Sequence, residues 1–372
     1  MKNGLINDIK KNDYIVSEQT IWNRIRERAA LQGVPIHGHF ELTPQCNLDC
    51  KMCYVHLNKG QMNGCTELSF FEWKQIIDQA VKSGMIFASL SGGECFLSPY
   101  FEDIYLYLQS KGVFVTILTN GVLLGDKLDF FELYPPVYIQ VSVYGKDEEA
   151  YEKVTGHKCF AKVKKNVDEA IEKRLNVGIA ITTSKYLTDI DDIIKYYKEK
   201  NISVTVSQWL MPPYDSTERL LENFNLSSEE QVDIAKRIMY TIEGKKPTPY
   251  DGKIPAPGGD SNNQLIRGIT CSAGRSDFSI SWNGAMSLCV SLNTPVGYPL
   301  IEGFENVWKR AREIADNFLM PVECVECVYS KICKHCPAQH LISANPGHCS
   351  SVICEETQLM VRAGLIELDN KI

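Results

Sequence analysis

The stretch Glu41-Leu-Thr-Pro-Gln-Cys46-Asn-Leu-Asp-Cys50-Lys-Met-Cys53-Tyr54 places three cysteines in a loop directly after a short strand-like segment. That segment is His37–Leu42, and α/β folds carry their active sites at the carboxyl ends of such strands. Three thiolates at this spacing can ligate three irons of a cubane cluster and leave the fourth iron open. A zinc site is the alternative, with His56 as a nearby fourth ligand.

Composition sets the broad class of the protein. The 372 residues are 44% apolar and 23% charged, which is ordinary for a globular chain. A net charge of −7 gives no indication of a nucleic-acid partner. No apolar run reaches the ~18 residues of a membrane span, and the polar N-terminus is unlike a signal peptide, so we expect a cytoplasmic protein with no membrane partner. Fourteen cysteines in a reducing compartment favour metal or redox chemistry over disulfides.

Short apolar strands are predicted to alternate with helices from residue 37 to residue 210. Five further strands are predicted, at Met85–Leu90, Val113–Leu118, Tyr138–Val143, Gly178–Thr183 and Ser203–Gln208. Helices fit between them, and Ser69 with Glu72 predicts a capping box at the start of one. Six βα units predict an α/β fold with a parallel sheet, open or curled into a partial (β/α)6 TIM-like barrel, because a full barrel needs eight.

The chain divides into four predicted parts. Residues 1–36 form a helical lead-in, 37–210 the barrel, 211–265 a proline- and glycine-rich linker region around one helix near Glu229–Tyr240, and 266–372 a small cysteine-rich domain. The last part carries most of the cysteines: Cys271, Cys289, Cys324, Cys327, Cys333, Cys336, Cys349 and Cys354. Its CxxC pairs suggest iron–sulfur or zinc binding, and such sites can also simply staple a domain that lacks a core of its own.

The first domain resembles the radical S-adenosylmethionine (SAM) enzymes. CxxxCxxC after the first strand is followed by an aromatic residue, Ser91-Gly92-Gly93-Glu94 after the second strand resembles the family's GGE motif, and Thr119-Asn120-Gly121 closes the third strand. The resemblance implies that Cys46, Cys50 and Cys53 hold a 4Fe–4S cluster that binds SAM and cleaves it reductively to a 5′-deoxyadenosyl radical. It implies SAM contacts from Met52, Tyr54, Gly92, Gly93, Glu94, Asn120, Ser142 and Lys153.

The cysteine-rich segment resembles the SPASM domain, a C-terminal extension of radical SAM enzymes that holds two auxiliary 4Fe–4S clusters. The spacing Cys333-x-x-Cys336 is one residue shorter than the family pattern. One cluster is implied to use Cys324, Cys327, Cys333 and Cys354, the last preferred to Cys349. The other is implied to use Cys271, Cys289 and Cys336, with either an open iron or a further ligand such as His335 or Cys349.

Relatives with this second domain largely modify ribosomally made peptides, so the resemblance implies a radical SAM oxidoreductase acting on a precursor peptide. Three hypotheses remain separate. The first is a crosslinking or thioether-forming enzyme, and the second is a peptide epimerase. The third is a dehydrogenase or epimerase that acts on a small molecule or on a protein residue, as in sulfatase maturation. The expected partners are the peptide, a flavodoxin- or ferredoxin-type electron donor and, since 36 residues are too few for a leader-binding domain, a separate leader-binding protein. A non-enzymatic iron–sulfur scaffold would leave the GGE motif without a purpose.

An epimerase also needs a thiol that donates a hydrogen atom. Cys95 takes the place where the family usually has proline after GGE, and Cys159 and Cys65 are the other isolated cysteines. The alternative for Cys95 is a small buried thiol without a chemical role.

Overall fold

The computed structural model describes residues 18–55, 66–208, 210, 224–250, 265–267, 269, 271–321, 324, 327–330, 332–333, 336–338 and 351–367. Four residues named as candidate ligands or hydrogen donors lie outside these ranges: His56, Cys65, His335 and Cys349.

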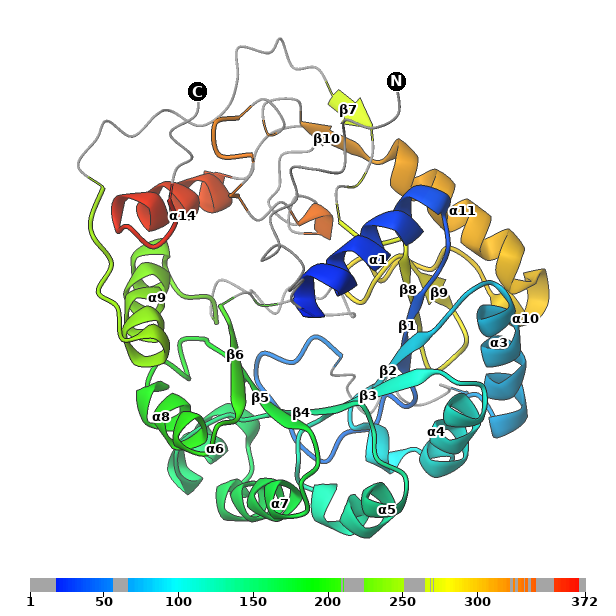
Figure 1. Ribbon diagram of the computed structural model, residues 1–372, viewed down its shortest axis with the longest axis horizontal. Coiled ribbons are helices and arrows are strands. Elements are labelled where there is room, and N and C mark those ends of the chain that lie inside the picture. Colours follow the sequence, from blue (N-terminus) through cyan, green and yellow to red (C-terminus); the bar gives the residue numbers. More distant parts are fainter. Residues whose placement is uncertain are drawn as a thin grey trace, which may run out of the picture.

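Six parallel strands form the centre of the fold. They are β1 (His37–Glu41), β2 (Phe87–Ser91), β3 (Phe114–Thr119), β4 (Tyr138–Ser142), β5 (Val177–Thr182) and β6 (Ser203–Ser207). Each strand pairs in parallel with the next along the chain, and the sheet curls with its helices outside (Figure 1). The predicted partial barrel is therefore confirmed, with strand ends within two residues of those expected from the sequence.

The sheet also continues beyond β1, which the sequence did not predict. Strand β8 (Asp277–Ile280) pairs in parallel with the free side of β1, and β9 (Met286–Ser287) pairs antiparallel with β8. A separate antiparallel pair is formed by β7 (Leu265–Arg267) and β10 (Leu319–Pro321). The segment predicted as the start of a second domain thus contributes strands to the barrel's own sheet.

Helices cover the outer face of the curled sheet (Figure 1). Between strands β2 and β6 the chain forms α4 (Phe101–Ser110), α5 (Leu128–Leu133), α6 (Glu148–Thr155), α7 (Phe160–Glu172) and α8 (Asp191–Glu199), with short 3₁₀ turns η1 (Cys95–Leu97) and η2 (Leu124–Lys127). Before β2 lies α3 (Phe70–Lys82), whose predicted capping box is present: the Ser69 amide donates to Glu72 at 2.8 Å and the Glu72 amide to Ser69 at 3.4 Å.

The remaining helices flank the ends of the sheet. Helix α9 (Ser228–Glu243) lies beside α14 (Ser351–Arg362) near β6, while α10 (Pro299–Glu302) and α11 (Phe304–Asn317) lie near β8 (Figure 1). Helix α1 (Glu18–Gln32) packs through Trp22, whose ring meets that of Phe87 edge-on at 4.7 Å between centroids. The indole of Trp308 donates to the Gly33 carbonyl at 2.8 Å, so the lead-in is tied to both β2 and α11.

The core lies between the sheet and its helices. Phe40 of β1 is fully buried and meets Trp73 of α3 and Phe278 of β8 edge-on, at centroid distances of 5.8 and 6.0 Å. Such contacts stabilise a core by ~1 kcal/mol beyond the area they bury. Because the same ring joins the first strand to β8, the C-terminal strands share the core of the barrel.

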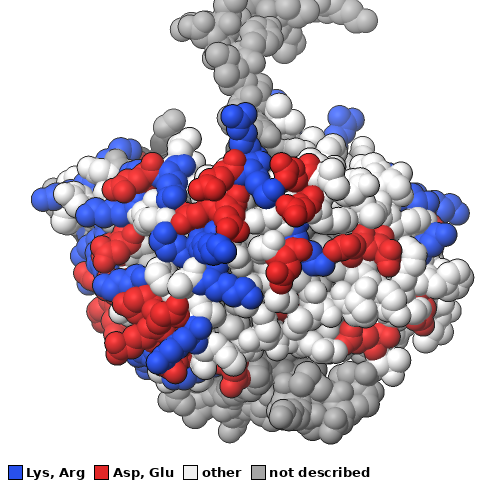
Figure 2. Space-filling view, turned by 90° about the horizontal axis from the view of Figure 1, so that it is seen from below, with Lys and Arg blue, Asp and Glu red and all other residues white. Residues whose placement is uncertain are grey.

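Lys, Arg, Asp and Glu side chains intermix on the helical face shown in Figure 2. Asp168 of α7, for example, pairs with Lys164 at 2.9 Å and with Lys200 at 3.0 Å. Exposed pairs of this kind each contribute ~0–1 kcal/mol to stability. Among the described helices, none has the length and apolar character to cross a membrane.

Candidate functional site

The cysteine loop, residues 42–55, follows β1 and is held from two sides. From the β2 side, the Gly93 amide donates to the Thr43 carbonyl at 2.8 Å and the Glu94 amide to the Gln45 carbonyl at 2.8 Å. From the α6 side, the Asp49 amide donates to the Thr155 carbonyl at 2.9 Å. These backbone hydrogen bonds tie the cysteine loop to the loop after β2 and to α6.

Gly92 and Gly93 allow the two loops to approach this closely. A Cβ atom on Gly92, whose φ is +139°, would lie 2.4 Å from the Thr43 carbonyl oxygen. A Cβ atom on Gly93 would lie 2.3 Å from the Gln45 carbonyl oxygen. Both neighbours are backbone and cannot swing away, so glycine is required at both positions. The predicted contact of these glycines with SAM remains a prediction, but their packing against the cysteine loop is sufficient reason for them.

Glu94 is 1% exposed and joins the ends of β2 and β3. Its carboxylate accepts from the Thr119 hydroxyl at 2.9 and 3.0 Å, from the Asn120 amide N–H at 2.8 Å and from the Phe96 amide at 3.3 Å. Burial raises the pKa of Glu94, and these donors oppose the rise by stabilising the charged form. The predicted contact with the SAM ammonium group remains a prediction, and it would add a cation to an already well-ordered carboxylate.

Asn120 connects β3 to the cysteine loop. Its side-chain N–H group donates to Asn47 Oδ1 at 2.7 Å and approaches Cys46 Sγ at 3.7 Å. Its side-chain oxygen accepts from the Val122 amide at 3.0 Å, which fixes the amide's orientation. The sequence predicted a SAM contact here; the structure gives the residue a second role that only the fold reveals, because Asn47 and Asn120 lie far apart in the chain.

The three thiols of the loop affect one another. The pKa of Cys46 is raised to about 11, mainly by burial; Glu94 and Cys53 contribute to the rise, while hydrogen bonds from Leu48 and Asn120 oppose it. Burial also raises the pKa of Cys50 well above its usual value, helped by Cys53 and Cys46 and opposed by the Tyr144 hydroxyl. Bound iron would oppose this effect, because it favours the thiolate form of the sulfurs that it binds.

Behind the loop lies a polar group that the protein leaves unsatisfied. The hydroxyl of Tyr151 is fully buried and has no well-formed hydrogen bond within the described part of the chain. Its ring lies 6.1 Å from that of Tyr144. Burial is the main cause that raises the pKa of Tyr151, and the nearby Cys50 thiol adds to the rise. A charged cluster held by this loop would offer the Tyr151 hydroxyl a partner, so the residues present fit a cubane there.

The zinc alternative remains open. Within the ranges given above, no group of three His, Cys, Asp or Glu side chains is placed to hold one ion. His56, the fourth ligand of that alternative, lies outside those ranges.

The other predicted SAM contacts occupy different settings. Met52 is buried in the core, and Tyr54 is partly buried beside Glu41 and Cys53. Ser142 hydrogen-bonds the Tyr144 hydroxyl at the end of β4. Lys153 is exposed on α6, and its side chain makes no hydrogen bond or ion pair with a described residue. Among the predicted SAM contacts it therefore has the fewest interactions with the rest of the described chain. Their roles toward SAM remain predictions.

Two of the three predicted hydrogen donors are described, and both are buried. The Cys95 thiol is fully buried and donates to the Leu118 carbonyl at 3.4 Å. Cys159 is 9% exposed at the start of α7, and burial raises its pKa to about 11. These settings suit structural thiols better than donors that must meet a substrate.

Some of the C-terminal cysteines lie near one another. Burial is the main cause that raises the pKa of Cys289, and Cys271 and Cys336 raise it further, so these three lie together. Cys333 is affected in the same way by Cys327. Cys324 is disulfide-bonded, so it would need to be reduced before ligating iron, and Cys354 is partly buried on α14. These ligand sets remain predictions.

The fold is a curled parallel sheet with a three-cysteine loop at the carboxyl ends of its strands. This arrangement is typical of barrel enzymes, whose active sites lie at those strand ends. Residues 40–199 match the Radical SAM superfamily, and this part of the chain is a radical SAM domain. That family implies a 4Fe–4S cluster and SAM, for which the cysteine loop is the fitting site.

Several curated relatives are similar to the barrel region. The chain is 25% identical over 181 residues to the subtilosin biosynthesis protein AlbA of Bacillus subtilis, covering 48% of this chain and 40% of AlbA. It is 24% identical over 154 residues to the PqqA peptide cyclase of Xanthomonas oryzae, covering 41% and 40%. It is 28% identical over 160 residues to the probable GTP 3′,8-cyclase of Aeropyrum pernix, covering 40% and 43%. The chain thus spans less than half the length of these relatives.

Two solved structures share the fold along most of the chain. Streptococcus suis SuiB bound to its precursor peptide SuiA has a TM-score of 0.66 at 15% identity, covering 94% of this chain and 84% of that one. The protein anSMEcpe with bound AdoMet has a TM-score of 0.66 at 15% identity, covering 88% and 97%. The likeness in fold therefore extends past the barrel into the cysteine-rich segment.

Proposed function

We propose that this protein cleaves SAM reductively and modifies a ribosomally made precursor peptide through a crosslink or thioether. The observation that carries the proposal is the ordered loop of Cys46, Cys50 and Cys53, packed against Gly92-Gly93-Glu94. When bound, the cluster and SAM supply a 5′-deoxyadenosyl radical that takes a hydrogen atom from the substrate. The protein's own groups would orient the SAM ammonium at Glu94.

The peptide as substrate is supported by the names of AlbA and the PqqA cyclase and by the precursor peptide bound to SuiB. Crosslinking is favoured over epimerisation because the two described donor candidates, Cys95 and Cys159, are buried. Two auxiliary clusters, held by the sets named above, would return the substrate's electron toward a flavodoxin- or ferredoxin-type donor, making the enzyme an oxidoreductase. A separate leader-binding protein would complete peptide recognition.

A small-molecule substrate is the second candidate, because one of the relatives is a probable GTP cyclase. The decisive experiment incubates anaerobically reconstituted protein with SAM and dithionite, with and without short peptides encoded beside its gene. We expect 5′-deoxyadenosine in every reaction and a peptide product lighter by two hydrogens. Unchanged mass with one deuterium gained from D₂O would indicate epimerisation instead. Absence of 5′-deoxyadenosine from fully iron-loaded protein would refute the proposal.

A further inference from the structure

Strand β6 ends the sheet on the side away from β1. It pairs in parallel with β5, and within the described part of the chain no strand pairs with its other side. The Thr183 amide donates to the Ser207 carbonyl at 2.8 Å, so the backbone groups of Ser207 face β5. Because these groups alternate in direction along a strand, the N–H and C=O groups of Val204 and Val206 face outward.

The sequence of β6 leaves this edge open to pairing. Its five residues, Ser-Val-Thr-Val-Ser, include no charged residue and no proline, and their side chains are exposed or half-buried in alternation. Proteins usually protect a free edge with charges, with proline or with a covering segment, because such an edge can add a further strand. An edge without this protection is the kind of surface to which extended peptides add as a strand.

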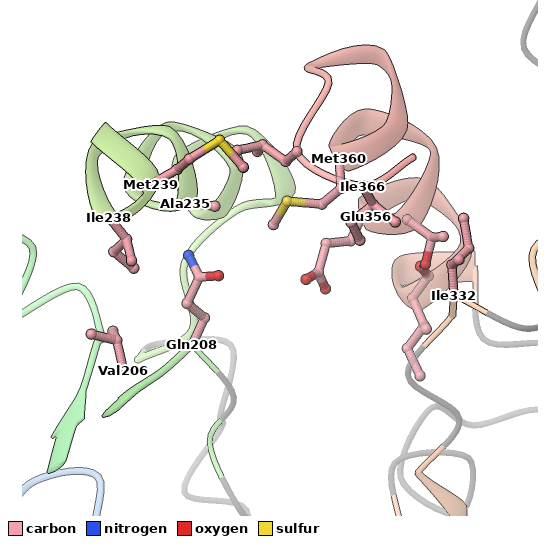
Figure 3. Close-up of a pocket in the computed structure, with 12 residues that line it drawn as sticks. Val206, Gln208, Ala235, Ile238, Met239, Ile332, Glu356, Met360 and Ile366 are labelled. Carbon is pink, nitrogen blue, oxygen red and sulfur yellow. The ribbon is translucent and has the colours of Figure 1, made fainter. Parts of the chain in front are cut away.

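A cavity of about 330 Å³ lies beside this edge, between β6, α9 and α14 (Figure 3). Val206 lines it from β6, Ile238 and Met239 line it from α9, and Met360 lines it from α14. Ligand sites in proteins usually measure ~300–1,000 Å³, so this one suits a single side chain. Methionine side chains are flexible and adapt to apolar groups of different shape.

The polar side chains in the cavity wall already have partners inside the protein. The Gln208 amide donates to the Gln231 backbone carbonyl at 2.6 Å, and the Thr357 hydroxyl donates to the Ile353 carbonyl at 2.8 Å. Glu356 accepts from the Gln231 side-chain amide at 3.1 Å, in the amide orientation that satisfies both groups. The wall therefore offers a ligand mainly apolar contact, while the unpaired hydrogen-bonding groups belong to the β6 edge.

The position of the cavity relates it to the cysteine loop. Gln208, which lines the cavity, follows β6 directly, so the cavity lies at the same carboxyl edge of the sheet as that loop. Neighbouring side chains of a strand point to opposite faces of its sheet. A strand added to β6 that places one side chain in the cavity therefore turns the next one toward the inner face of the barrel.

We propose that an extended segment of the precursor peptide adds to β6 as a further strand and places an apolar side chain in this cavity. Backbone hydrogen bonds to Val204 and Val206 supply affinity that does not depend on sequence, and the cavity selects the side chain. The precursor peptide as the occupant rests on the proposed function. The open edge and the cavity do not.

The first test needs no ligand. Hydrogen exchange of single amides in the reconstituted full-length chain is read by mass spectrometry with electron-transfer fragmentation. The amides of Val204 and Val206 should exchange about tenfold faster than those of Thr205 and Ser207, because only the latter two face β5. Equal protection of all four amides would mean that another segment of this chain, or a second copy of it, occupies the edge, and would overturn the proposal.

The second test uses three peptide probes. The first is acetyl-Thr-Leu-Thr-Leu-Thr-N-methylamide; one analogue is N-methylated at every amide, and the other has serine in place of both leucines. Saturation-transfer NMR should show the first probe binding about tenfold more tightly than either analogue. Equal binding of the N-methylated analogue would overturn the backbone pairing, and equal binding of the serine analogue would overturn the role of the cavity.

Matched variants locate the binding. Ala235→Phe fills the cavity from α9 and should weaken binding of the first probe about tenfold. Lys236→Phe adds the same ring at an exposed neighbour that does not line the cavity, and should leave binding unchanged. Equal weakening in both variants would overturn the proposal. If Ala235→Phe fails to fold, Val206→Pro removes an outward N–H group while keeping the bonds to β5, and unaltered binding there would overturn it.

The peptide as occupant has its own test. For the peptide that the enzyme modifies, Ala235→Phe should raise KM about tenfold relative to Lys236→Phe, because the added strand loses its apolar contact. An unchanged KM would overturn the precursor peptide as the occupant. The probes are read without SAM cleavage, so failure of this proposal and failure of the proposed function are distinguishable.

Discussion

The two cysteine-rich regions differ in what holds them in place. The first is fixed by backbone hydrogen bonds to the loop after β2 and to α6. At the neighbouring Gly92 and Gly93 there is no room for a larger residue. The second draws its thiols from loops and α14 between residues 271 and 354, where described strands are as short as the two residues of β9. A fold can thus preorganise a metal site before metal arrives, or depend on the metal to assemble it.

The largest difference should come from removing one thiol in each region. Cys50→Ala should abolish SAM cleavage and reduce iron from about twelve to about eight per chain, with little change in Tm, because the loop's backbone bonds remain. Cys327→Ala should lose the same amount of iron but lower Tm markedly, because the described backbone hydrogen bonds there, such as that from the Ser330 amide to the Cys327 carbonyl at 2.8 Å, join residues of the same turn. Iron analysis, chromatography of 5′-deoxyadenosine and thermal unfolding measure these outcomes. A large drop in Tm for Cys50→Ala would break the comparison.

Metal removal should separate the regions next. After anaerobic chelation, amides at residues 327–333 should exchange with deuterium much faster, while those of β2 and β3 stay protected, because metal binding there is folding free energy. Hydrogen exchange read by mass spectrometry gives both regions in one experiment. Equal loss of protection in the barrel would mean that the first site also depends on its metal.

The same contrast explains what the sequence could predict. The six strands follow local apolar patterns and lie within two residues of their expected ends. Helix α3 begins at its capping box for the same reason, since Ser69 and Glu72 are three residues apart. Local chemistry specifies these features without knowledge of the rest of the fold.

Features that depend on distant residues were not predictable in this way. Strand β8 is four residues long, and nothing within Asp277–Ile280 specifies β1 as its partner. The bond from Asn120 to Asn47 spans 73 residues, and that from Thr119 to Glu94 spans 25. The motif identified Glu94 and Asn120 as important, but only the three-dimensional arrangement shows that they also order the cysteine loop.

A smaller effect is expected from tightening the contact between the loops. Gly93→Ala places a methyl group 2.3 Å from the Gln45 carbonyl oxygen and should weaken iron retention in the first region about tenfold, because the cysteine loop must shift. Gly112→Ala is the control: its φ is +74° with open space around it, so it should cost ~1 kcal/mol of stability and leave iron unchanged. The rate of iron release to a chelator and the Tm are measured for both variants. Together they distinguish the backbone strain expected in Gly112→Ala from the steric clash expected in Gly93→Ala. Wild-type iron retention in Gly93→Ala would show that the loop tolerates displacement.

The smallest effect concerns a single hydrogen bond to sulfur. Asn120→Ala removes the N–H group 3.7 Å from Cys46 and should shift the reduction potential of the first cluster to a more negative value, because such bonds stabilise the more negatively charged reduced form. Asn166→Ala is the matched control, since Asn166 donates to the Gly121 carbonyl at 2.9 Å and so anchors the same β3 loop without reaching a thiol. Potentiometric titration followed by electron paramagnetic resonance measures both. Equal shifts in the two variants would assign the effect to loop position. A shift confined to Asn120→Ala would show that the residue after a barrel strand tunes the cluster directly.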